Sequence, residues 1–333
     1  MQPKSRPFAL GTFTQGDQPS FPALVLDEQV FPLGSLPQFN SLSGAATILS
    51  LLENWEANLA VLQSAVDSLD ETSAIPLAQV KIHPPVNLPR QIFCSGANYK
   101  KHVIDLIVDE GGGPASENMT TEERRAWATK MMDDRATNGF PYMFSKPVSV
   151  VTGAYDYIVL PPHAKAPDWE LELAVVIGRK ARHVTKADAL NYVAGYAIVN
   201  DITNRDHVFR RDAVKAMGSD WVAAKGSPTY LPFGPYLVPA AFVENPQDLQ
   251  LTLKLNGEIK QDESTADMIF DIARQIEYLS SLVELWPGDV ICTGSPAGNG
   301  THYKRFLQEG DVVESTITGL GMQRNVCVKE VTQ

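Results

Sequence analysis

The stretch APDWELELAVVIGRK, residues 166–180, places three carboxylates directly before an apolar run. Side chains of a β-strand alternate between two faces, so Asp168, Glu170 and Glu172 share one face. The apolar run AVVIG is typical of a buried strand, and burying unpaired carboxylates beside it would cost several kcal/mol each. We therefore expect positive charge to face this row of acids.

The row of acids has two interpretations. On a solvated edge strand, lysine or arginine side chains would balance the E-x-E pair. Because the strand continues into AVVIG, we favour a buried group of carboxylates, which suits Mg²⁺ or Mn²⁺ better than zinc. Asp201 ends the apolar strand VAGYAIVND, where side chains emerge at the rim of a sheet, and could supply a third ligand.

The composition is that of an ordinary globular protein. The chain has 333 residues, of which 44% are hydrophobic and 20% charged, with a formal net charge of -11. An acidic chain argues against nucleic acid or an anionic membrane as a partner, since both favour basic surfaces. The three cysteines form no C-x-x-C pair, and we find neither a signal peptide nor a membrane-spanning apolar run. We expect a cytoplasmic protein.

The order of patterns along the chain predicts an α+β fold that is predominantly β. Short strands and one helical stretch fill residues 1–85, which we predict to be a small N-terminal domain. Residues 86–333 are dominated by short β-type runs without regular βαβ alternation, and we predict that they form the main domain. Two polar helices over about 99–138 are expected to form a lid that is mobile without ligand.

Common catalytic signatures do not account for the chain. The glycines of GSPAGNG, residues 294–300, are out of register with G-x-G-x-x-G, and no helical run follows them. H-E-x-x-H, G-x-S-x-G and P-loop patterns are also missing from the sequence. The usual support for a dinucleotide enzyme, a zinc peptidase, an α/β-hydrolase or a nucleotide triphosphatase is therefore lacking.

A series of short blocks resembles the fumarylacetoacetate hydrolase family. In order, between about residues 90 and 330, they are GANYKKH, SKP, DWELELAVVIG, GYAIVNDITNRD, AAKGSPTYLPFGPYLV, NGEIKQ, WPGDVICTGSPAGNG and TGLG. The resemblance implies a mixed β-sandwich roll as the catalytic domain and a homodimer as the assembly. It also implies a small diketo or 2-oxo acid as the substrate.

The resemblance also implies a metal centre. Glu170, Glu172 and Asp201 match the metal ligands, which would hold Mg²⁺ or Mn²⁺, and Ca²⁺ could occupy the same oxygens in a crystal. Lys225 matches the lysine that lies beside the metal and the substrate oxygen. A cation held by three carboxylates can stabilise the enolate that forms when a carbon–carbon bond is cleaved.

The remaining site residues follow from the same blocks. His102 matches the general base, and Asp105, three residues later on the same side of a helix, would polarise it. Arg205 would orient an acidic substrate or support the metal ligands. The T-G-S-P block offers Thr293, Gly294 and Ser295 to the substrate.

From these assignments we predict a metal-dependent hydrolase that cleaves a carbon–carbon bond of an acylpyruvate or a related β-diketo acid. Water activated by His102 would attack the distal carbonyl while Lys225 and Ser295 hold the enolate and the carboxylate. An oxaloacetate-type decarboxylase and a 2-oxo acid tautomerase or dehydratase stay open, because each could use the same metal site. A silent binding protein is disfavoured, since it would need neither the acids nor the lysine.

Overall fold

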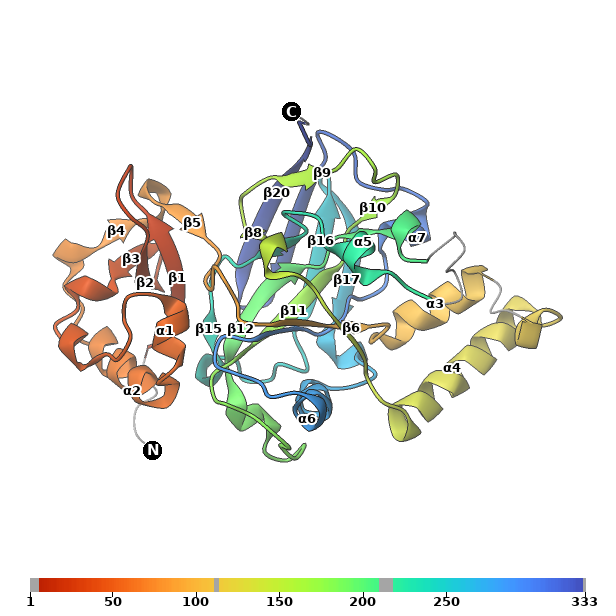
Figure 1. Ribbon diagram of the computed structural model, residues 1–333, viewed down its shortest axis with the longest axis horizontal. Coiled ribbons are helices and arrows are strands. Elements are labelled where there is room, and N and C mark those ends of the chain that lie inside the picture. The colour runs from red at the N-terminus through yellow and green to blue at the C-terminus, as the bar shows by residue number, and fades with distance from the viewer. Residues whose placement is uncertain (1–5, 111–113, 210–217, 332–333) are drawn as a thin grey trace.

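The computed structural model describes residues 6–110, 114–209 and 218–331 (Figure 1). The described strands form four sheets. The first sheet contains β1 (Ala9–Thr14), β2 (Phe21–Leu26), β3 (Gln29–Pro32), β4 (Ile75–Pro76) and β5 (Lys81–His83), in the order β4-β3-β2-β1-β5. Helices α1 (Ile48–Leu52) and α2 (Trp55–Val66) complete this N-terminal unit, at the left of Figure 1.

The body of the protein is built on two larger sheets. One has the order β7-β6-β18-β11-β12-β14-β8, with β15 pairing to β12, and the other has the order β17-β16-β19-β20-β9. Their bounds are β6 Ile92–Gly96, β7 Tyr142–Ser145, β8 Val151–Gly153, β9 Ile158–Leu160, β11 Leu171–Ile177, β12 Val193–Asn200, β14 Leu231–Phe233, β15 Val238–Pro239, β16 Gln250–Leu255, β17 Glu258–Ser264, β18 Val290–Cys292, β19 Val312–Ile317 and β20 Gly321–Lys329. The sheets mix parallel and antiparallel pairs, and the predicted α+β, predominantly β fold is confirmed.

The central strand pair positions the acids. Every residue of β11 and β12 is buried, as the β-branched run AVVI predicted. The two strands are antiparallel, with Leu171 opposite Asn200, so the residues before β11 lie beside those after β12. The small sheet of β10 (Pro167–Asp168) and β13 (Thr203–Asn204) continues this pairing beyond the rim.

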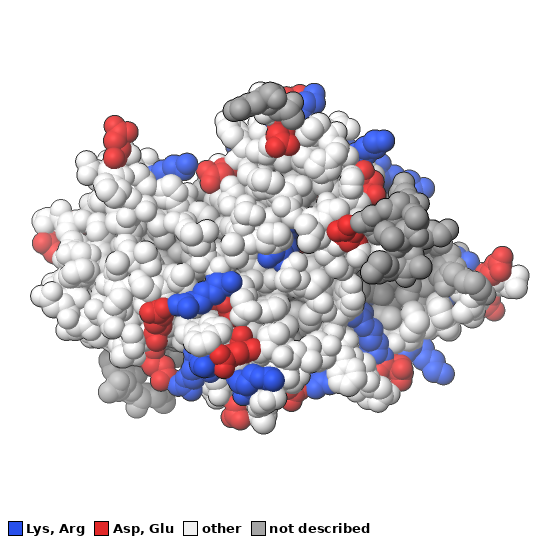
Figure 2. Space-filling view, viewed as in Figure 1, with Lys and Arg blue, Asp and Glu red and all other residues white. Residues whose placement is uncertain are grey.

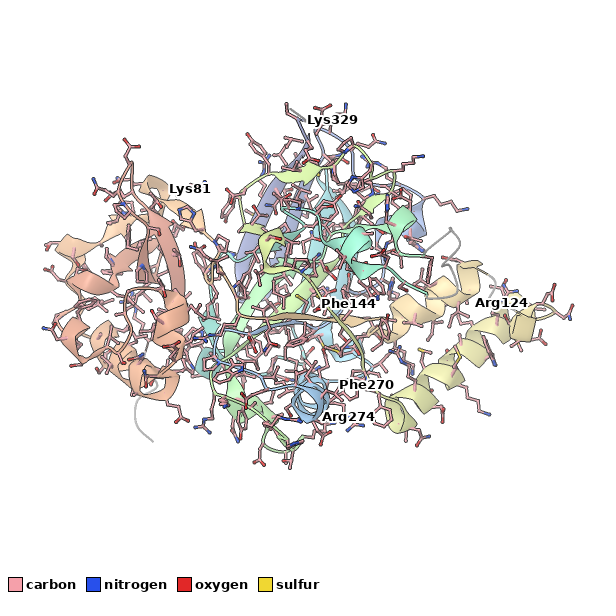
Figure 3. All side chains as sticks on the ribbon, in the orientation of Figure 1. Lys81, Arg124, Phe144, Phe270, Arg274 and Lys329 are labelled. Carbon is pink, nitrogen blue, oxygen red and sulfur yellow. The ribbon has the colours of Figure 1, made fainter. Side chains whose placement is uncertain are left out.

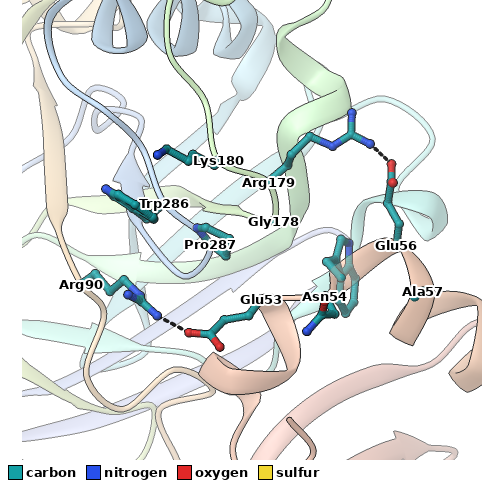
Figure 4. A pocket seen from close by; sticks show the side chains of 11 residues that line it. Glu53, Asn54, Glu56, Ala57, Arg90, Gly178, Arg179, Lys180, Trp286 and Pro287 are labelled. Atoms are coloured by element: carbon teal, nitrogen blue, oxygen red, sulfur yellow. Dashed lines mark hydrogen bonds and ion pairs between the residues drawn. The ribbon is translucent and has the colours of Figure 1, made fainter. Parts of the chain in front are cut away.

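The N-terminal unit and the body share one hydrophobic core. Leu10 and Leu237 exchange two backbone hydrogen bonds of 2.8 Å, and Leu24 of β2 and Leu62 of α2 belong to the same buried cluster as Val176. Arg90–Glu53 and Arg179–Glu56 ion pairs also cross the junction, around a cavity of about 510 Å³ (Figure 4). The sheets therefore divide near residue 85, but their apolar side chains pack together.

Two helices project from the body as an arm, at the right of Figure 1. Helices α3 (Lys100–Glu110) and α4 (Thr121–Asn138) pack through a small cluster of Ile104, Ala128 and Met132. Arg124 of α4, labelled in Figure 3, donates a hydrogen bond to the Val108 carbonyl of α3 at 3.3 Å. The arm occupies the range predicted for the lid, while its motion stays a prediction.

Three further helices complete the described chain: α5 (Trp221–Lys225), α6 (Ile272–Leu282) and α7 (Gly300–Tyr303). Helix α6 begins at its N-cap Asp271, whose side chain accepts from the Arg274 N–H, and it buries Ile272, Ile276 and Leu279. Among the described helices, none has the length and apolar character needed to cross a bilayer. Figure 2 shows acidic and basic side chains interspersed on the face viewed.

Asp289, in the turn before β18, should make stability depend on pH. Its buried Oδ2 accepts from the Trp286 N–H and from Nε2 of Gln91, each at 2.7 Å. Burial raises the pKa of Asp289 from 3.8 to about 6. The unfolded chain releases this proton at lower pH than the folded protein, so the free energy of unfolding falls as pH rises through this interval.

We expect Asp289→Asn to remove this pH dependence, because asparagine keeps an oxygen for both donors but carries no charge. At pH near 8 the variant should be more stable than the wild type by roughly 1 to 3 kcal/mol, and the gap should shrink toward pH of about 4. Urea unfolding at both pH values measures this difference. A variant that is less stable than the wild type at the higher pH would contradict the raised pKa.

Candidate functional site

The three predicted metal ligands meet at the rim of the central strand pair. One carboxylate oxygen each from Glu170, Glu172 and Asp201 lies within 4.8 Å of the others. The Asp201 N–H donates to the Glu170 carbonyl at 2.8 Å, and the Glu170 N–H donates to Oδ1 of Asn200 at 2.8 Å. These two hydrogen bonds hold the ends of the two strands side by side. Glu170 and Glu172 share one face of their strand, and Asp201 lies next to them.

Three cations face the acids, as expected from the sequence. Lys225 Nζ lies 3.2 Å from Oε2 of Glu170 and also pairs with Asp201. Lys146 Nζ lies 2.6 Å from Oδ1 of Asp201 and donates to two backbone carbonyls, at 2.8 and 3.1 Å. Arg205 contributes the third cation, and its guanidinium pairs with Glu170. Since Lys146 is fully buried, its charge depends on Asp201 for compensation.

Asp168 belongs to the row but not to the metal-ligand group. Its Oδ2 accepts from Nε of Arg205 at 2.8 Å and from the Thr301 N–H at 3.2 Å, and Gly300 donates to Oδ1 at 2.5 Å. Arg205 therefore bridges Asp168 and Glu170, as a support for the ligands. The carboxylate that starts the row is used to anchor the arginine and the first turn of α7.

The charges in this group do not balance. Four acids, Asp168, Glu170, Glu172 and Asp201, face three cations, so one acid is left without a cation of its own. That acid is Glu172, which has no cationic partner within hydrogen-bonding reach among the described residues. Burial and the neighbouring Asp201 raise the pKa of Glu172 well above its ordinary value. It accepts a hydrogen bond from the Gly294 N–H at 2.7 Å.

Glu170 contrasts with its neighbour on the strand. Burial would raise its pKa, but Arg205 and Lys225 outweigh burial and lower the pKa to about 2. Burial would lower the pKa of Lys225, but the charges of Asp201 and Glu170 raise it above its ordinary value. At neutral pH Glu170 is therefore charged and Lys225 is protonated. A buried set of three carboxylate oxygens, one of them from an acid without a described cationic partner, fits a hard divalent cation.

A cavity of about 390 Å³ opens over Glu170. Its polar part includes His102 from α3, Arg205 and Lys225, with Ser295 and Asn299 from the loop after β18. Burial and the Arg205 charge lower the pKa of His102 to about 4. The imidazole is therefore unprotonated at neutral pH, which is the state that a general base requires.

Asp105 does not take the position expected for a partner of His102. Its Oδ1 accepts from Arg125 of α4 at 2.8 Å, and these two described side chains, His102 and Asp105, form no hydrogen bond with each other. The spacing correctly places them on the same helix, but it carries no information on a competing arginine from α4. Asp105 still acts on His102 through its charge, which raises the pKa of the imidazole against burial and Arg205. Its role in polarising His102 stays a prediction.

The T-G-S-P block is only partly turned toward the cavity. Thr293 donates its hydroxyl to the Leu173 carbonyl at 2.9 Å, and the Gly294 N–H is bound to Glu172. Ser295 lines the cavity, and Nε2 of Gln261 donates to its hydroxyl at 2.9 Å. Thr293 and Gly294 therefore hold the protein together, and Ser295 is the member of the block that a ligand could contact.

Two features of the site are not predicted by the sequence: the buried Lys146 beside Asp201 and an aromatic side of the cavity. Lys146 lies in the SKP block, where a lysine before proline gives no sign that it is buried against Asp201. The aromatic side is a set of residues comprising Tyr142, Phe144 and Trp221. The sequence does carry a pattern for this set. Tyr142 and Phe144 are two residues apart and so share one face of β7, and Trp221 lies one helical turn before Lys225.

Comparison with known proteins gives several matches over most of the chain. The family model described as the fumarylacetoacetate (FAA) hydrolase C-terminal domain matches residues 91–328. The human mitochondrial oxaloacetate tautomerase FAHD2B is 34% identical over 284 residues, which are 85% of this chain and 80% of that protein.

Two solved structures are similar along nearly the whole chain. The crystal structure of a protein assigned as HpcE from Mycobacterium smegmatis has a TM-score of 0.74 at 29% identity, over 96% of this chain and 99% of that one. A fumarylacetoacetate hydrolase from Exiguobacterium antarcticum has a TM-score of 0.73 at 26% identity, over 97% of this chain and 100% of that one. The chain therefore belongs to the fumarylacetoacetate hydrolase family.

Proposed function

We propose that this protein is a divalent-metal-dependent enzyme that interconverts the keto and enol forms of a 2-oxo acid. The observation that carries the proposal is the uncompensated group of Glu170, Glu172 and Asp201, beside a protonated Lys225 and an unprotonated His102. These three acids would hold Mg²⁺ or Mn²⁺. The bound ion would polarise the 2-oxo and carboxylate oxygens and so lower the free energy of the enolate.

The side chains on the cavity then have separate tasks. His102 takes a proton from the carbon next to the 2-oxo group, because its imidazole is neutral at the working pH, and the oxygen takes a proton from water to give the enol. The reverse transfers restore the keto form. Lys225 donates a hydrogen bond to the oxygen that gains negative charge during this transfer. Arg205 holds Glu170 and Asp168 in place, so that the acids keep their positions while charge moves on the substrate.

Tautomerisation needs less of the site than hydrolysis does. It moves one proton on the substrate, whereas hydrolysis also requires an activated water. Asp105, which was expected to strengthen His102 for that purpose, is bound to Arg125. The name of the human relative, an oxaloacetate tautomerase, supports the same reaction type.

Cleavage of an acylpyruvate is the second candidate. It is favoured by the neutral His102 on a cavity with room for a longer substrate and a water molecule. An assay with Mg²⁺ or Mn²⁺ separates the candidates. Tautomerisation of oxaloacetate changes the enol absorbance without loss of CO₂, hydrolysis of acetylpyruvate releases acetate and pyruvate, and decarboxylation of oxaloacetate releases CO₂. Faster release of acetate than enol conversion would overturn the tautomerase proposal.

We expect Glu172→Gln to abolish the response to metal. Glutamine can still accept the Gly294 N–H, so the variant without metal should be at least as stable as the wild type. Mn²⁺ should raise Tm of the wild type and leave Tm of the variant unchanged, as scanning fluorimetry would report. EDTA should remove wild-type turnover. Glu258→Gln, at a side chain that is 74% exposed, is the matched control, and a full metal response in Glu172→Gln would refute the ligand assignment.

His102 and Asp105 should differ strongly in their effect on turnover. His102→Ala is expected to lower kcat by about 10² to 10⁴, the usual contribution of a general base, while the metal-induced rise in Tm persists. Asp105→Ala should lower kcat by less than about fivefold, because it breaks a partly exposed ion pair with Arg125. Steady-state kinetics of both variants tests this. Equal losses would show that the two residues act together during turnover.

The assembly is a separate prediction. We expect a homodimer, on the basis of the family resemblance in the blocks from residue 90 to the C-terminus. Light scattering coupled to gel filtration at micromolar concentration should give twice the mass of the chain. A single-chain mass that persists at high concentration would contradict this expectation.

A further inference from the structure

The cavity over the acids has an apolar part that the proposed chemistry does not use. Tyr142, Phe144 and Trp221 form one side of this part, which Leu106, Val208 and Phe209 also line. We call Tyr142, Phe144 and Trp221 the aromatic wall. The Phe144 and Trp221 rings are stacked with centroids 4.5 Å apart and an interplanar angle of 13°. Nε1 of Trp221 donates to the Tyr142 hydroxyl at 2.8 Å, which fixes the orientation of both rings.

The strand below the wall is shaped to carry Tyr142. Gly96 of β6 lies opposite Tyr142 of β7, and a Cβ atom on Gly96 would lie 2.7 Å from the Tyr142 ring. A side chain at this position would push the ring away from the strand, so glycine allows the ring to lie flat against the backbone. The wall is therefore held by ring stacking, one hydrogen bond and the close contact with Gly96, although Tyr142 itself is 47% exposed.

The aromatic wall lies next to Lys225, where the 2-oxo acid group of the substrate would bind. Lys225 Nζ lies 5.1 Å from the Phe144 ring centroid, and Trp221 lies one turn earlier on the same short helix, α5. Phe144, labelled near the centre of the body in Figure 3, thus lies next to both the lysine and the Trp221 ring. A 2-oxo acid whose oxygens approach Lys225 would project its third and later carbons along the aromatic wall.

The described charged side chains that line the cavity lie in its other part. Its described basic side chains, His102, Arg205 and Lys225, all lie close enough to Glu170 to act on it electrostatically. Among the described residues, the aromatic wall adds no cation that could bind a second carboxylate. An apolar tail would gain contact with the rings there, whereas a charged tail would lose water without a partner.

From this arrangement we infer that the preferred substrate is a 2-oxo acid with an apolar, flat tail, such as a phenyl ring, held against Tyr142 and Trp221. The inference rests on the proposed function, because it takes the metal and Lys225 as the place where the 2-oxo acid head binds. Stacking against the indole and phenol rings would provide the selectivity.

Three ligands with the same head test the inference: pyruvate, without a tail; oxaloacetate, with a carboxylate tail; and phenylpyruvate, with a phenyl tail. Titration calorimetry with Mn²⁺ present gives their dissociation constants, and enol absorbance gives tautomerisation rates for the last two. We expect phenylpyruvate to bind about tenfold more tightly than pyruvate or oxaloacetate. Tighter binding of oxaloacetate than of phenylpyruvate would overturn the inference, even if its tautomerisation bears out the proposed function.

Variants of the wall assign the preference to its residues. Trp221→Ala should weaken phenylpyruvate binding about tenfold and change pyruvate binding by less than about twofold. Because Trp221 shares α5 with Lys225, Tyr142→Ala provides an independent test from a different element and should reduce the same preference.

Trp286→Ala is the matched control, because Trp286 is a partly exposed tryptophan at the junction with the N-terminal unit (Figure 4). It should leave all three dissociation constants unchanged. An unchanged preference in both Trp221→Ala and Tyr142→Ala would overturn the inference. Loss of binding of all three ligands in wild-type protein would instead count against the proposed function.

Discussion

The constraint on which the structure depends is the compensation of negative charge at the end of the central strand pair. Three cations reach this point from separate parts of the chain: Lys146 follows β7, Arg205 follows β13, and Lys225 ends α5. A buried charge that loses its partner is destabilising by roughly 3 to 5 kcal/mol. The path of the loops around the sheet rim is therefore tied to electrostatics as much as to apolar packing.

The arrangement of the acids was predictable because it follows from local rules. Alternation along a strand places Glu170 and Glu172 on one face, and a buried run ending in Asn-Asp places Asp201 at a rim. The pattern of one strand cannot show that Asp201 lies beside Glu170 and Glu172. That prediction came from the resemblance to the family. The predominantly β architecture was readable for the same reason, since short β-branched runs separated by glycine and proline are local signals.

The details that the sequence did not disclose depend on partners from distant elements. Arg125 binds Asp105 because α4 packs on α3, and helical spacing within α3 contains no trace of that contact. Gly294 donates to Glu172 because β18 lies beside β11 in the sheet. Lys146 could be recognised as buried only after the strand order placed its segment over Asp201. Ion pairs between distant elements depend on the tertiary structure, whereas hydrophobic periodicity describes only a single helix or strand.

The short helix α5 has a consequence for how this protein could change over evolution. It carries Trp221 and Lys225 one turn apart, so a substitution that reshapes the helix to admit a different ligand would also shift the ammonium group that two acids hold. Tyr142 shares no element with the acids or with Lys225, and nearly half of its surface is exposed. Diversification among descendants of this protein should therefore accumulate at residue 142 sooner than at residue 221.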